Sequence, residues 1–485
     1  MQHSVSQLYK MTRIDLNFGI FYNVVDGERR ASDKTTFSVD PSTESKLWDV
    51  PVASTQDVED AVRSANEAFK TWSATSFEER MKKLSQWKEI YRSYIEDFTQ
   101  LLMAECGKPR AVASGEANEV LALFDHNLQL CMPEERLEDE IRIQTTRHVP
   151  VGVVAAICPW NFPLVLSVGK ILPALLTGCT IIVKPSPFTP YSALKMVEQA
   201  QQIFPPGVVQ AIGGNDSIGS ELVNHPHVNK ITFTGSSATG KKIMASAAGT
   251  LKRVTLELGG NDPAIIYPDV DIKKIAPEVV QGCFVFSGQV CVATKRVYVH
   301  ERIYDAFLEA MVEAASQMVV GKAGNPSTTM GPMQNKMQYE KVKELIADSE
   351  AQGYKFALPP QPMASGNGFY LSPSIVDNPP PKSRIVLEEQ FGPIVPVLKW
   401  TDEADVIAWA NGTNSGLGAS VWSADVARAE RVGRLMQAGS VFVNSWAKTT
   451  PRAMLSGHKE SGLGGEWGST GFLEYCNTQV VHIFK

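Results

Sequence analysis

Two kinds of hydrophobic pattern alternate along the chain between about residues 147 and 260. Short runs of nearly continuous apolar residues, typical of buried strands, are VPVGVVAAICP, CTIIVKPS, GVVQAIGG, KITFTGS and RVTLELGG. Segments with apolar residues at helical spacing lie between them and include PLVLSVGKILPALLTG, SALKMVEQAQQIF, SIGSELVNH and SATGKKIMASAAG. This alternation predicts a parallel sheet covered by helices on both faces. Such a sheet binds ligands beyond the carboxyl ends of its strands.

The flanking regions predict helices before this sheet and a second α/β region after it. Helical spacing runs from residue 55 to Gly107 with a break near 73–76, and Thr55 is the predicted N-cap. Strand-like and helical segments alternate again from about 262 to 460, around predicted loops at 359–368 and 378–383. The last apolar run, QVVHIF, predicts a strand that pairs somewhere else in the fold. The predicted fold class is α/β, with two parallel-sheet domains.

Composition excludes several functions without identifying one. A chain of 485 residues predicts two or three domains, and its net charge of −6 argues against a general nucleic-acid binder. No apolar run reaches the length of a transmembrane helix, so no membrane partner is expected. The first residues lack the pattern of a secretory or transit peptide.

The cysteines and histidines predict a reducing compartment and no metal site. The seven cysteines occur singly, without a CxxC pair, and we therefore expect a cytoplasmic protein. None of the eight histidines pairs with a cysteine at zinc spacing. The sequence HPH at 225–227 contains a proline and predicts a surface loop.

The stretch ITFTGSSATGKK, residues 231–242, nearly matches a nucleotide-binding P-loop. A P-loop requires Ser or Thr after its lysine to hold magnesium, and this chain has Lys242 there. No strand ending in Asp that would complete an NTPase site is obvious downstream. The stretch therefore holds another phosphate ligand or only forms a strand–helix turn.

A candidate nucleophile lies in CFVFSGQVCVATKR, residues 283–296. Gly288 permits a sharp turn just before Cys291, and a turn into a helix would place the thiol at a helix N-terminus. That position stabilises a thiolate, and Arg296 would anchor the helix. The alternative is that Cys291 is a small buried core residue.

Two further residues are candidates for acid–base and oxyanion chemistry. Glu257 lies at a predicted strand end among apolar neighbours, where burial raises the pKa of a carboxyl group toward that of a general base. The alternative is a carboxylate paired in a salt bridge at a domain edge. Asn161 lies between two prolines and predicts either an oxyanion donor or a simple turn former.

Six motifs occur together in one order: PWNFP (159–163), FTGS (233–236) with Gly240, ELGG (257–260), GQVC (288–291) followed by Arg296, EEQFGP (388–393) and SGLGGEWG (461–468). In this set the chain resembles the NAD(P)-dependent aldehyde dehydrogenase superfamily, from about residue 20 to the end. The resemblance implies that Cys291 is the nucleophile and Glu257 the general base. It also implies that Asn161 and the Cys291 N–H form an oxyanion hole.

The resemblance implies a non-standard Rossmann domain that binds NAD or NADP. Its expected contacts are Pro159, Trp160, Lys184, Ser186, Gly235, Ser236, Gly240, Leu258, Glu389 and Phe391. The expected cofactor-binding domain spans 1–131 and 151–256, and the catalytic domain 257–460. Residues 132–150 and 461–485 would form an element that builds a homodimer or homotetramer.

Several positions depart from the pattern common among these relatives. Phe286 replaces an asparagine, which is expected to alter packing near the nucleophile, and Gly465 replaces an arginine before Glu466, a candidate proton-relay residue. Pro187 stands where NAD-preferring members often carry a glutamate that binds the ribose 2′-hydroxyl. Without that carboxylate, a 2′-phosphate meets less repulsion, so we expect the enzyme to accept NADP.

The substrate pocket is predicted to be wide. Gly169 and Leu455 stand where relatives often carry large aromatic residues, and Trp446 is expected at the mouth of the pocket. A bulky or aromatic aldehyde is therefore the expected substrate. The structural alternative for Gly169 is close packing between helices. A non-catalytic scaffold is disfavoured because Cys291, Glu257 and Asn161 are present together.

Overall fold

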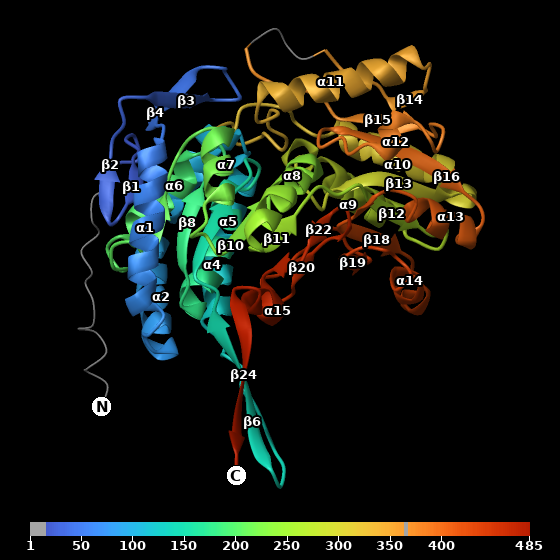
Figure 1. The fold of residues 1–485 in the computed structure, drawn as a ribbon. Helices are drawn as coiled ribbons and strands as arrows, with labels where there is room; N and C mark the ends of the chain where they lie inside the picture. The colour runs from blue at the N-terminus through green and yellow to red at the C-terminus, as the bar shows by residue number, and fades with distance from the viewer. Residues whose placement is uncertain (1–15, 363–366) are drawn as a thin grey trace, which may run out of the picture.

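The computed structural model describes residues 16–362 and 367–485 and contains two large sheets, each flanked by helices (Figure 1). The predictions made for residues 1–15 and for the middle of the 359–368 loop lie outside the described residues. The predicted α/β class with two parallel-sheet domains is confirmed.

The first sheet has the strand order β2-β1-β9-β8-β7-β10-β11-β22. Its strands are β1 (Asn23–Val25), β2 (Glu28–Arg30), β7 (Val153–Ile157), β8 (Thr180–Lys184), β9 (Val209–Ala211), β10 (Lys230–Thr234), β11 (Arg253–Glu257) and β22 (Gly462–Leu463). The run from β9 to β11 is parallel, as the apolar strands predicted. The two ends are antiparallel, where β1 pairs with β9 and β22 with β11.

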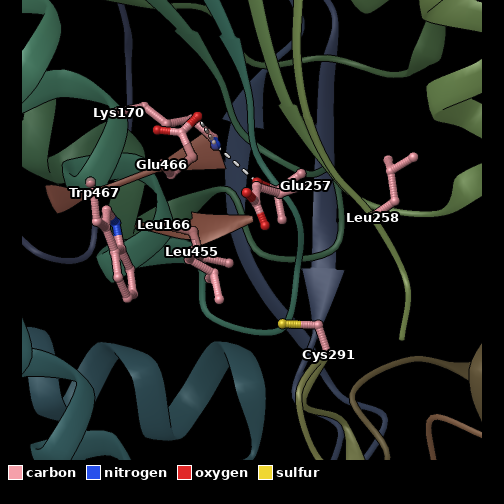
Figure 2. Close-up of a pocket in the computed structure, with 10 residues that line it drawn as sticks. Leu166, Lys170, Glu257, Leu258, Cys291, Leu455, Glu466 and Trp467 are labelled. Carbon is pink, nitrogen blue, oxygen red and sulfur yellow. Dashed lines mark hydrogen bonds and ion pairs between the residues drawn. The ribbon is translucent and has the colours of Figure 1, made fainter. Parts of the chain in front are cut away.

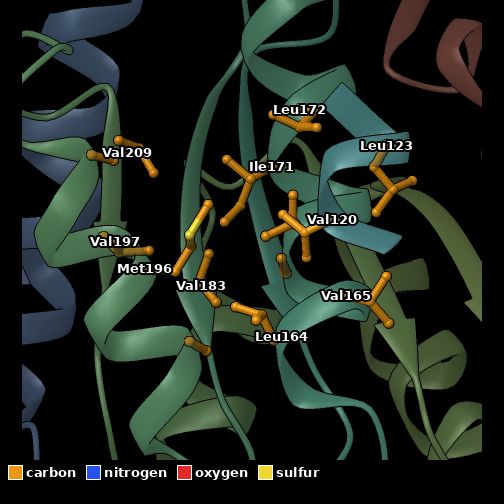
Figure 3. Packing of buried hydrophobic residues seen from close by; sticks show 14 of the residues in the cluster. Val120, Leu123, Leu164, Val165, Ile171, Leu172, Val183, Met196, Val197 and Val209 are labelled. Atoms are coloured by element: carbon orange, nitrogen blue, oxygen red, sulfur yellow. The ribbon is translucent and has the colours of Figure 1, made fainter. Parts of the chain in front are cut away.

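Helices bury both faces of this sheet because successive strand residues point to opposite sides. In β7, Val154 and Ala156 join the core shown in Figure 3, whereas Val153 and Ala155 join the core on the opposite face. The first core is built largely from α2 (Phe77–Arg92), α3 (Ile95–Cys106), α4 (Arg110–Asn127), α5 (Pro163–Thr177) and α6 (Tyr191–Ala200). The second core uses α1 (Thr55–Trp72), α7 (Asp216–Asn224) and α8 (Ser237–Ala247).

The N-terminal helices follow the predicted pattern with one correction and one addition. The break at 73–76 separates α1 from α2, and Gly107 ends α3 at φ 69°. The predicted N-cap at Thr55 is wrong by one residue, because the Ser54 side chain accepts the Asp57 N–H and forms a capping box. A second break, between α2 and α3, was not predicted.

The second sheet has the order β14-β15-β16-β13-β12-β18-β19 and is parallel except where β14 pairs with β15. Its strands are β12 (Asp262–Ile266), β13 (Thr294–His300), β14 (Phe356–Leu358), β15 (Ser374–Asp377), β16 (Ile394–Trp400), β18 (Gly418–Trp422) and β19 (Ser440–Val443). The helices of this region are α9 (Ile272–Phe284), α10 (Tyr304–Ser316), α11 (Lys336–Ala351), α12 (Arg384–Leu387), α13 (Glu403–Ala410) and α14 (Val426–Gly433).

A three-stranded arm projects from the body of the protein (Figure 1). It consists of β5 (Glu135–Glu138), β6 (Arg142–Pro150) and β24 (Cys476–Phe484), and the predicted C-terminal strand is therefore confirmed. Its exposed large apolar side chains are Leu137, Ile141, Val480, Val481, Ile483 and Phe484. The domain boundaries given above remain a prediction.

Short elements complete the described fold. They are β3 (Thr35–Val39), β4 (Lys46–Pro51), β17 (Ser415–Gly416), β20 (Leu455–Ser456), β21 (His458–Lys459), β23 (Gly465–Glu466) and α15 (Gly468–Leu473). The pair β20 and β23 matters for function because it contributes a wall of the cavity described below. In the part of the chain that the structure describes, no helix has the length and apolarity to span a membrane.

Candidate active site

A cavity of about 20 Å³ is lined both by strand ends of the first sheet and by the loop that leads into β13 of the second (Figure 2). This volume suits roughly one water molecule. Its lining comes from α5, from the ends of β10 and β11, from the loop before β13 and from the β20–β23 pair. The lining residues are Leu166, Gly169, Lys170, Thr234, Glu257, Leu258, Cys291, Leu455, Glu466 and Trp467. The cavity therefore brings together Cys291 and Glu257, which are separated in the sequence.

Cys291 lies in a turn between a 3-10 segment (Val285–Gly288) and β13. The predicted helix after this cysteine is wrong, since the chain enters a strand at Thr294. Three consecutive residues before it are left-handed, namely Phe286 at φ 48°, Ser287 at φ 56° and Gly288 at φ 73°. These left-handed residues turn the chain so that Cys291 lines the cavity. No helix begins at Cys291, so no helix N-terminus stabilises its thiolate.

Arg296 does not anchor a helix either. Its guanidinium lies within the second sheet and donates to the carbonyl oxygens of Asn261 at 2.9 Å, Trp409 at 3.0 Å and Ala410 at 2.8 Å. These bonds attach β13 to two neighbouring segments. The arginine thus supports the strand that follows the nucleophile.

The thiol of Cys291 is held mainly in its neutral form. Burial raises the pKa of the Cys291 thiol to about 12, and Lys295 acts against this shift. The nearby carboxylates of Glu257, Asp262 and Glu389 raise the same pKa further, because each disfavours a second negative charge. Reaction at neutral pH therefore requires stabilisation of the thiolate by a positive charge or by proton transfer.

Glu257 ends β11 and is 4% exposed. Burial, with the nearby Glu466 carboxylate next, raises the pKa of Glu257 well above its usual value, and the Lys170 ammonium acts against this shift. Its Oε1 atom has no hydrogen-bond partner among the described residues. The predicted strand-end position and raised pKa are both present, whereas the alternative of a direct salt bridge is not found in the described part of the chain.

A buried polar network lies behind Glu257. The Lys170 Nζ donates to Thr234 Oγ1 at 2.8 Å and to Glu466 Oε1 at 3.1 Å (Figure 2). Glu466 also accepts hydrogen bonds from Thr232 and, at 3.1 Å, from the Tyr475 hydroxyl. Sequence reasoning missed Lys170, since a single lysine in an apolar helix gives little functional signal.

Asn161 lies beside the nucleophile loop. Its Nδ2 atom donates to the Gln289 carbonyl oxygen at 3.0 Å, and the side chain is buried. An amide nitrogen carries two N–H groups, so one remains for a second acceptor. This bond holds the Asn161 side-chain amide next to Gln289, which precedes Cys291 by two residues in the sequence.

A buried ion pair positions the turn that carries Asn161. Glu116 accepts the Leu164 and Val165 N–H groups at 3.0 and 3.1 Å, where α5 begins, and pairs with Lys108. The Lys108 ammonium lies 3.7 Å from the centre of the Phe162 ring and 4.6 Å from that of Phe286. Phe286, which departs from the common pattern, therefore packs against the segment next to Asn161.

The wall opposite the thiol contains Gly169 and Trp467. A Cβ atom on Gly169 would lie 2.5 Å from Trp467 Nε1, so the space left by the glycine is filled by the indole. Leu455 lines the cavity as predicted. Trp446, expected at the mouth of the pocket, is not among the residues that line this cavity, and its ring packs against Gly282 in α9.

The predicted cofactor residues gather at the carboxyl ends of the parallel strands. Strand register aligns Ile157 with Lys184, and Thr234 with Glu257. Pro159 and Trp160 follow β7, Ser186 follows β8, and Gly235 follows β10. This is the edge where α/β sheets bind nucleotides.

The turn after β10 has the features of a phosphate-binding turn. Ser236 caps α8 by accepting the Thr239 N–H at 3.3 Å, and the first N–H groups of α8 follow it. A Cβ atom on Gly240 would lie 2.6 Å from a Leu258 methyl group, so this glycine serves close packing. Lys241 is exposed and pairs with Glu460 at 2.8 Å, as expected for a solvated helix residue rather than a P-loop lysine.

Two further predicted cofactor residues, Glu389 and Phe391, lie on the catalytic side. Glu389 Oε1 accepts the Gly260 N–H at 3.2 Å, and Phe391, at φ 48°, meets the Trp160 ring edge-on at 5.3 Å between centres. Burial lowers the pKa of Lys184 to about 8, and Asp216 on α7 acts against this shift. Hydroxyl and N–H groups that can donate to phosphate, a carboxylate that can accept from a ribose, and aromatic rings thus suit a dinucleotide. Within residues 16–362 and 367–485, no cluster of three or more His, Cys, Asp or Glu residues is placed to hold a metal ion.

Comparisons with known proteins agree with this arrangement. The sequence model of the aldehyde dehydrogenase family matches residues 29–481. Aldehyde dehydrogenase LUC3 of a Fusarium species is 42% identical over 471 residues, which cover 97% of this chain and 100% of that protein. The NAD+ complex of a Bacillus cereus aldehyde dehydrogenase has a TM-score of 0.93 at 32% identity, covering 98% of this chain and 100% of that one. An NADP-dependent enzyme of E. coli has a TM-score of 0.93 at 32% identity, covering 97% and 99%.

Proposed function

The chain belongs to the aldehyde dehydrogenase family and is an NAD(P)-dependent aldehyde dehydrogenase, and from this premise we propose that Cys291, Glu257 and Asn161 perform its chemistry. The observation that carries the proposal is that a cysteine thiol and a buried carboxyl group line one cavity (Figure 2). A thiol supplies a nucleophile, and a carboxyl group with a raised pKa supplies a base.

The first half of the reaction uses the thiol. The Cys291 thiolate adds to the aldehyde carbonyl carbon, and negative charge develops on the aldehyde oxygen. The free N–H of Asn161 and the backbone N–H of Cys291 are the proposed donors to that oxygen. When bound, NAD(P)+ supplies the hydride acceptor, and loss of hydride from the adduct leaves a thioester on Cys291.

The second half uses the carboxylate. Glu257 takes a proton from a water molecule, the water oxygen attacks the thioester, and a carboxylic acid leaves while Cys291 regains its thiol. The unpartnered Oε1 atom of Glu257 supports this role, since among the described residues it has an acceptor position to spare. Lys170 and Glu466 line the same cavity and are hydrogen-bonded to each other, so they offer a route for the proton away from Glu257.

We propose that the cofactor lies along the carboxyl edge of the first sheet. Ser236 and the N-terminus of α8 would hold the pyrophosphate, and Lys184 with Ser186 the adenosine ribose. Glu389 would hold the nicotinamide ribose, next to Phe391. The chain uses NAD or NADP, and Pro187, in place of a carboxylate, supports acceptance of the 2′-phosphate of NADP.

The proposed substrate is a bulky or aromatic aldehyde. The cavity walls beside the thiol are apolar at Leu166, Leu455 and Trp467, which favours an apolar substrate. The indole of Trp467 occupies the space above Gly169, so a large substrate would lie against this ring or displace it. We also propose a cytoplasmic location, supported by the free cysteines, and a homodimer or homotetramer built through the exposed apolar side chains of the β5–β6–β24 arm.

A panel of aldehydes assayed with NAD+ and with NADP+ tests these proposals. Bulky and aromatic aldehydes should give NAD(P)H formation, followed by its absorbance, with higher kcat/KM than short charged aldehydes. Turnover limited to short charged aldehydes would refute the substrate proposal. A strict preference for NAD+ would refute the cofactor proposal, and neither result would affect the family assignment.

A further inference from the structure

Lys295 is a buried lysine that binds the loop carrying the nucleophile. Its side chain is 3% exposed. Its Nζ atom donates to the carbonyl oxygens of Cys291 at 2.7 Å, Val290 at 2.9 Å and Ala293 at 3.4 Å. An ammonium group has three N–H donors, so all three can be used on this one turn. The loop that presents the thiol is thereby gathered around a single cation.

The same ammonium also lies close to an acidic residue on a neighbouring loop. Its Nζ atom lies 3.5 Å from Glu389 Oε1 and 5.9 Å from the centre of the Phe391 ring. Burial raises the pKa of Asp262 to about 6, and the Lys295 charge acts against this shift. Burying a lysine ammonium destabilises the fold unless the charge is paired or hydrogen-bonded. Lys295 meets this condition between the nucleophile loop and the residues proposed to hold the nicotinamide ribose.

The charges around the thiol are unbalanced without Lys295. Glu257 from β11, Asp262 from β12 and Glu389 from the loop after α12 all oppose a thiolate at Cys291. Of the groups that act most strongly on the pKa of this thiol, Lys295 from β13 is the one that favours the thiolate. The neighbouring Arg296 instead directs its guanidinium to backbone carbonyls and Tyr298.

We propose that Lys295 is a positioning residue that fixes the Cys291 turn and supplies the positive charge that makes its thiol reactive. It acts through Cys291 and does not contact the substrate. The proposal deepens the proposed function, since it concerns the same nucleophile. A purely structural role is the competing explanation, in which the lysine stem fills space and its charge is irrelevant.

Two variants separate charge from packing. Lys295→Met keeps an unbranched apolar stem and removes the charge, whereas Lys295→Arg keeps the charge. The thiol is probed with iodoacetamide in the absence of aldehyde and cofactor, from mildly acidic to alkaline pH, and alkylation of the Cys291 peptide is followed by mass spectrometry. Cys131 is exposed and lies in a different part of the chain, so its alkylation serves as an internal control.

The expected result is a fall of about tenfold or more in the Cys291 alkylation rate of Lys295→Met near neutral pH, because one pH unit in the thiol midpoint is tenfold in thiolate. The alkylation rate of both proteins should rise with pH, but the deficit of Lys295→Met should persist over this range, because both thiols remain mainly neutral there. Lys295→Arg should stay close to wild type. Cys131 should react equally in all three proteins.

A wild-type Cys291 alkylation rate in Lys295→Met at every pH would overturn the proposal. A wild-type rate in Lys295→Met together with slow reaction in Lys295→Arg would establish the packing explanation. If Lys295→Met does not fold, as judged by circular dichroism, Lys295→Arg decides alone: a Cys291 alkylation rate close to wild type supports the charge role, and slow alkylation contradicts it. The assay uses no cofactor or aldehyde, so its result can be interpreted even if the proposed dehydrogenase chemistry is disproved.

Discussion

Gly169→Ala tests how tightly Trp467 closes the wall of the cavity. The added Cβ would lie 2.5 Å from Trp467 Nε1, 3.4 Å from Cδ1 and 3.5 Å from Cε2. The shortest of these is about 1 Å below ordinary contact distance, so the indole or α5 must move. Overpacking of this kind costs about 1–3 kcal/mol, while alanine in a helix gains about 1 kcal/mol over glycine.

Gly115→Ala provides the matched control in α4, because a Cβ atom at Gly115 would have no neighbour within 4 Å among the described residues outside its own turn of helix. Both substitutions gain the helix preference of alanine, so their difference isolates the overpacking. In urea unfolding followed by circular dichroism, Gly169→Ala should be less stable than Gly115→Ala by about 1–3 kcal/mol. Equal stability of the two variants would refute the contact between Gly169 and Trp467.

The consequence for function follows from the position of Trp467. An indole displaced by Gly169→Ala would move in the cavity wall, and KM should rise more for bulky aldehydes than for small ones. Combining Trp467→Phe with Gly169→Ala removes the Nε1 atom that the new Cβ would meet, so part of the lost stability should return. No recovery in this double variant would place the strain elsewhere.

Two further predictions concern charges near the site. Glu466→Gln removes a negative charge that raises the pKa of Glu257, so the acid limb of the kcat–pH profile should move to lower pH by about one pH unit, whereas Lys170→Met removes an opposing positive charge and should move it to higher pH. Shifts in the same direction would contradict this electrostatic account. Asp216→Asn removes a negative charge near Lys184 but also lowers the pKa of this lysine below about 8, so the assay is run well below pH 8, where Lys184 stays charged, and kcat/KM for NADP+ relative to NAD+ should then rise by up to about tenfold. An unchanged ratio would show that Asp216 does not face the 2′-phosphate.

The strands and helices of the first sheet were predictable because their signals are local. A run such as TIIVK is buried at every position, and a nearly continuous apolar pattern suffices to predict a strand covered on both faces. Capping signals also placed the end of α3 at Gly107. The N-cap of α1 was missed by one residue because Ser54 and Thr55 carry the same chemistry and only the bond to Asp57 distinguishes them.

The details of the site depend on contacts between distant segments, and local patterns do not contain them. The turn at Cys291 is set by left-handed residues and by the bonds from Lys295, so a glycine followed by a cysteine wrongly suggested a helix. The wide pocket was inferred largely from Gly169, whereas Trp467, distant in the chain, fills the space above it. Lys170 likewise acquires its environment from Glu466.

The most direct test of the two-step chemistry is a rapid-mixing experiment with Cys291→Ala and Glu257→Gln, using NAD(P)+ and a reactive aldehyde. Cys291→Ala should form no NAD(P)H. Glu257→Gln should form a burst of about one NAD(P)H per active site and then turn over slowly, because the thioester forms without the base and its hydrolysis is impaired. Wild-type turnover in Cys291→Ala, or absence of the burst in a folded Glu257→Gln enzyme, would contradict the account.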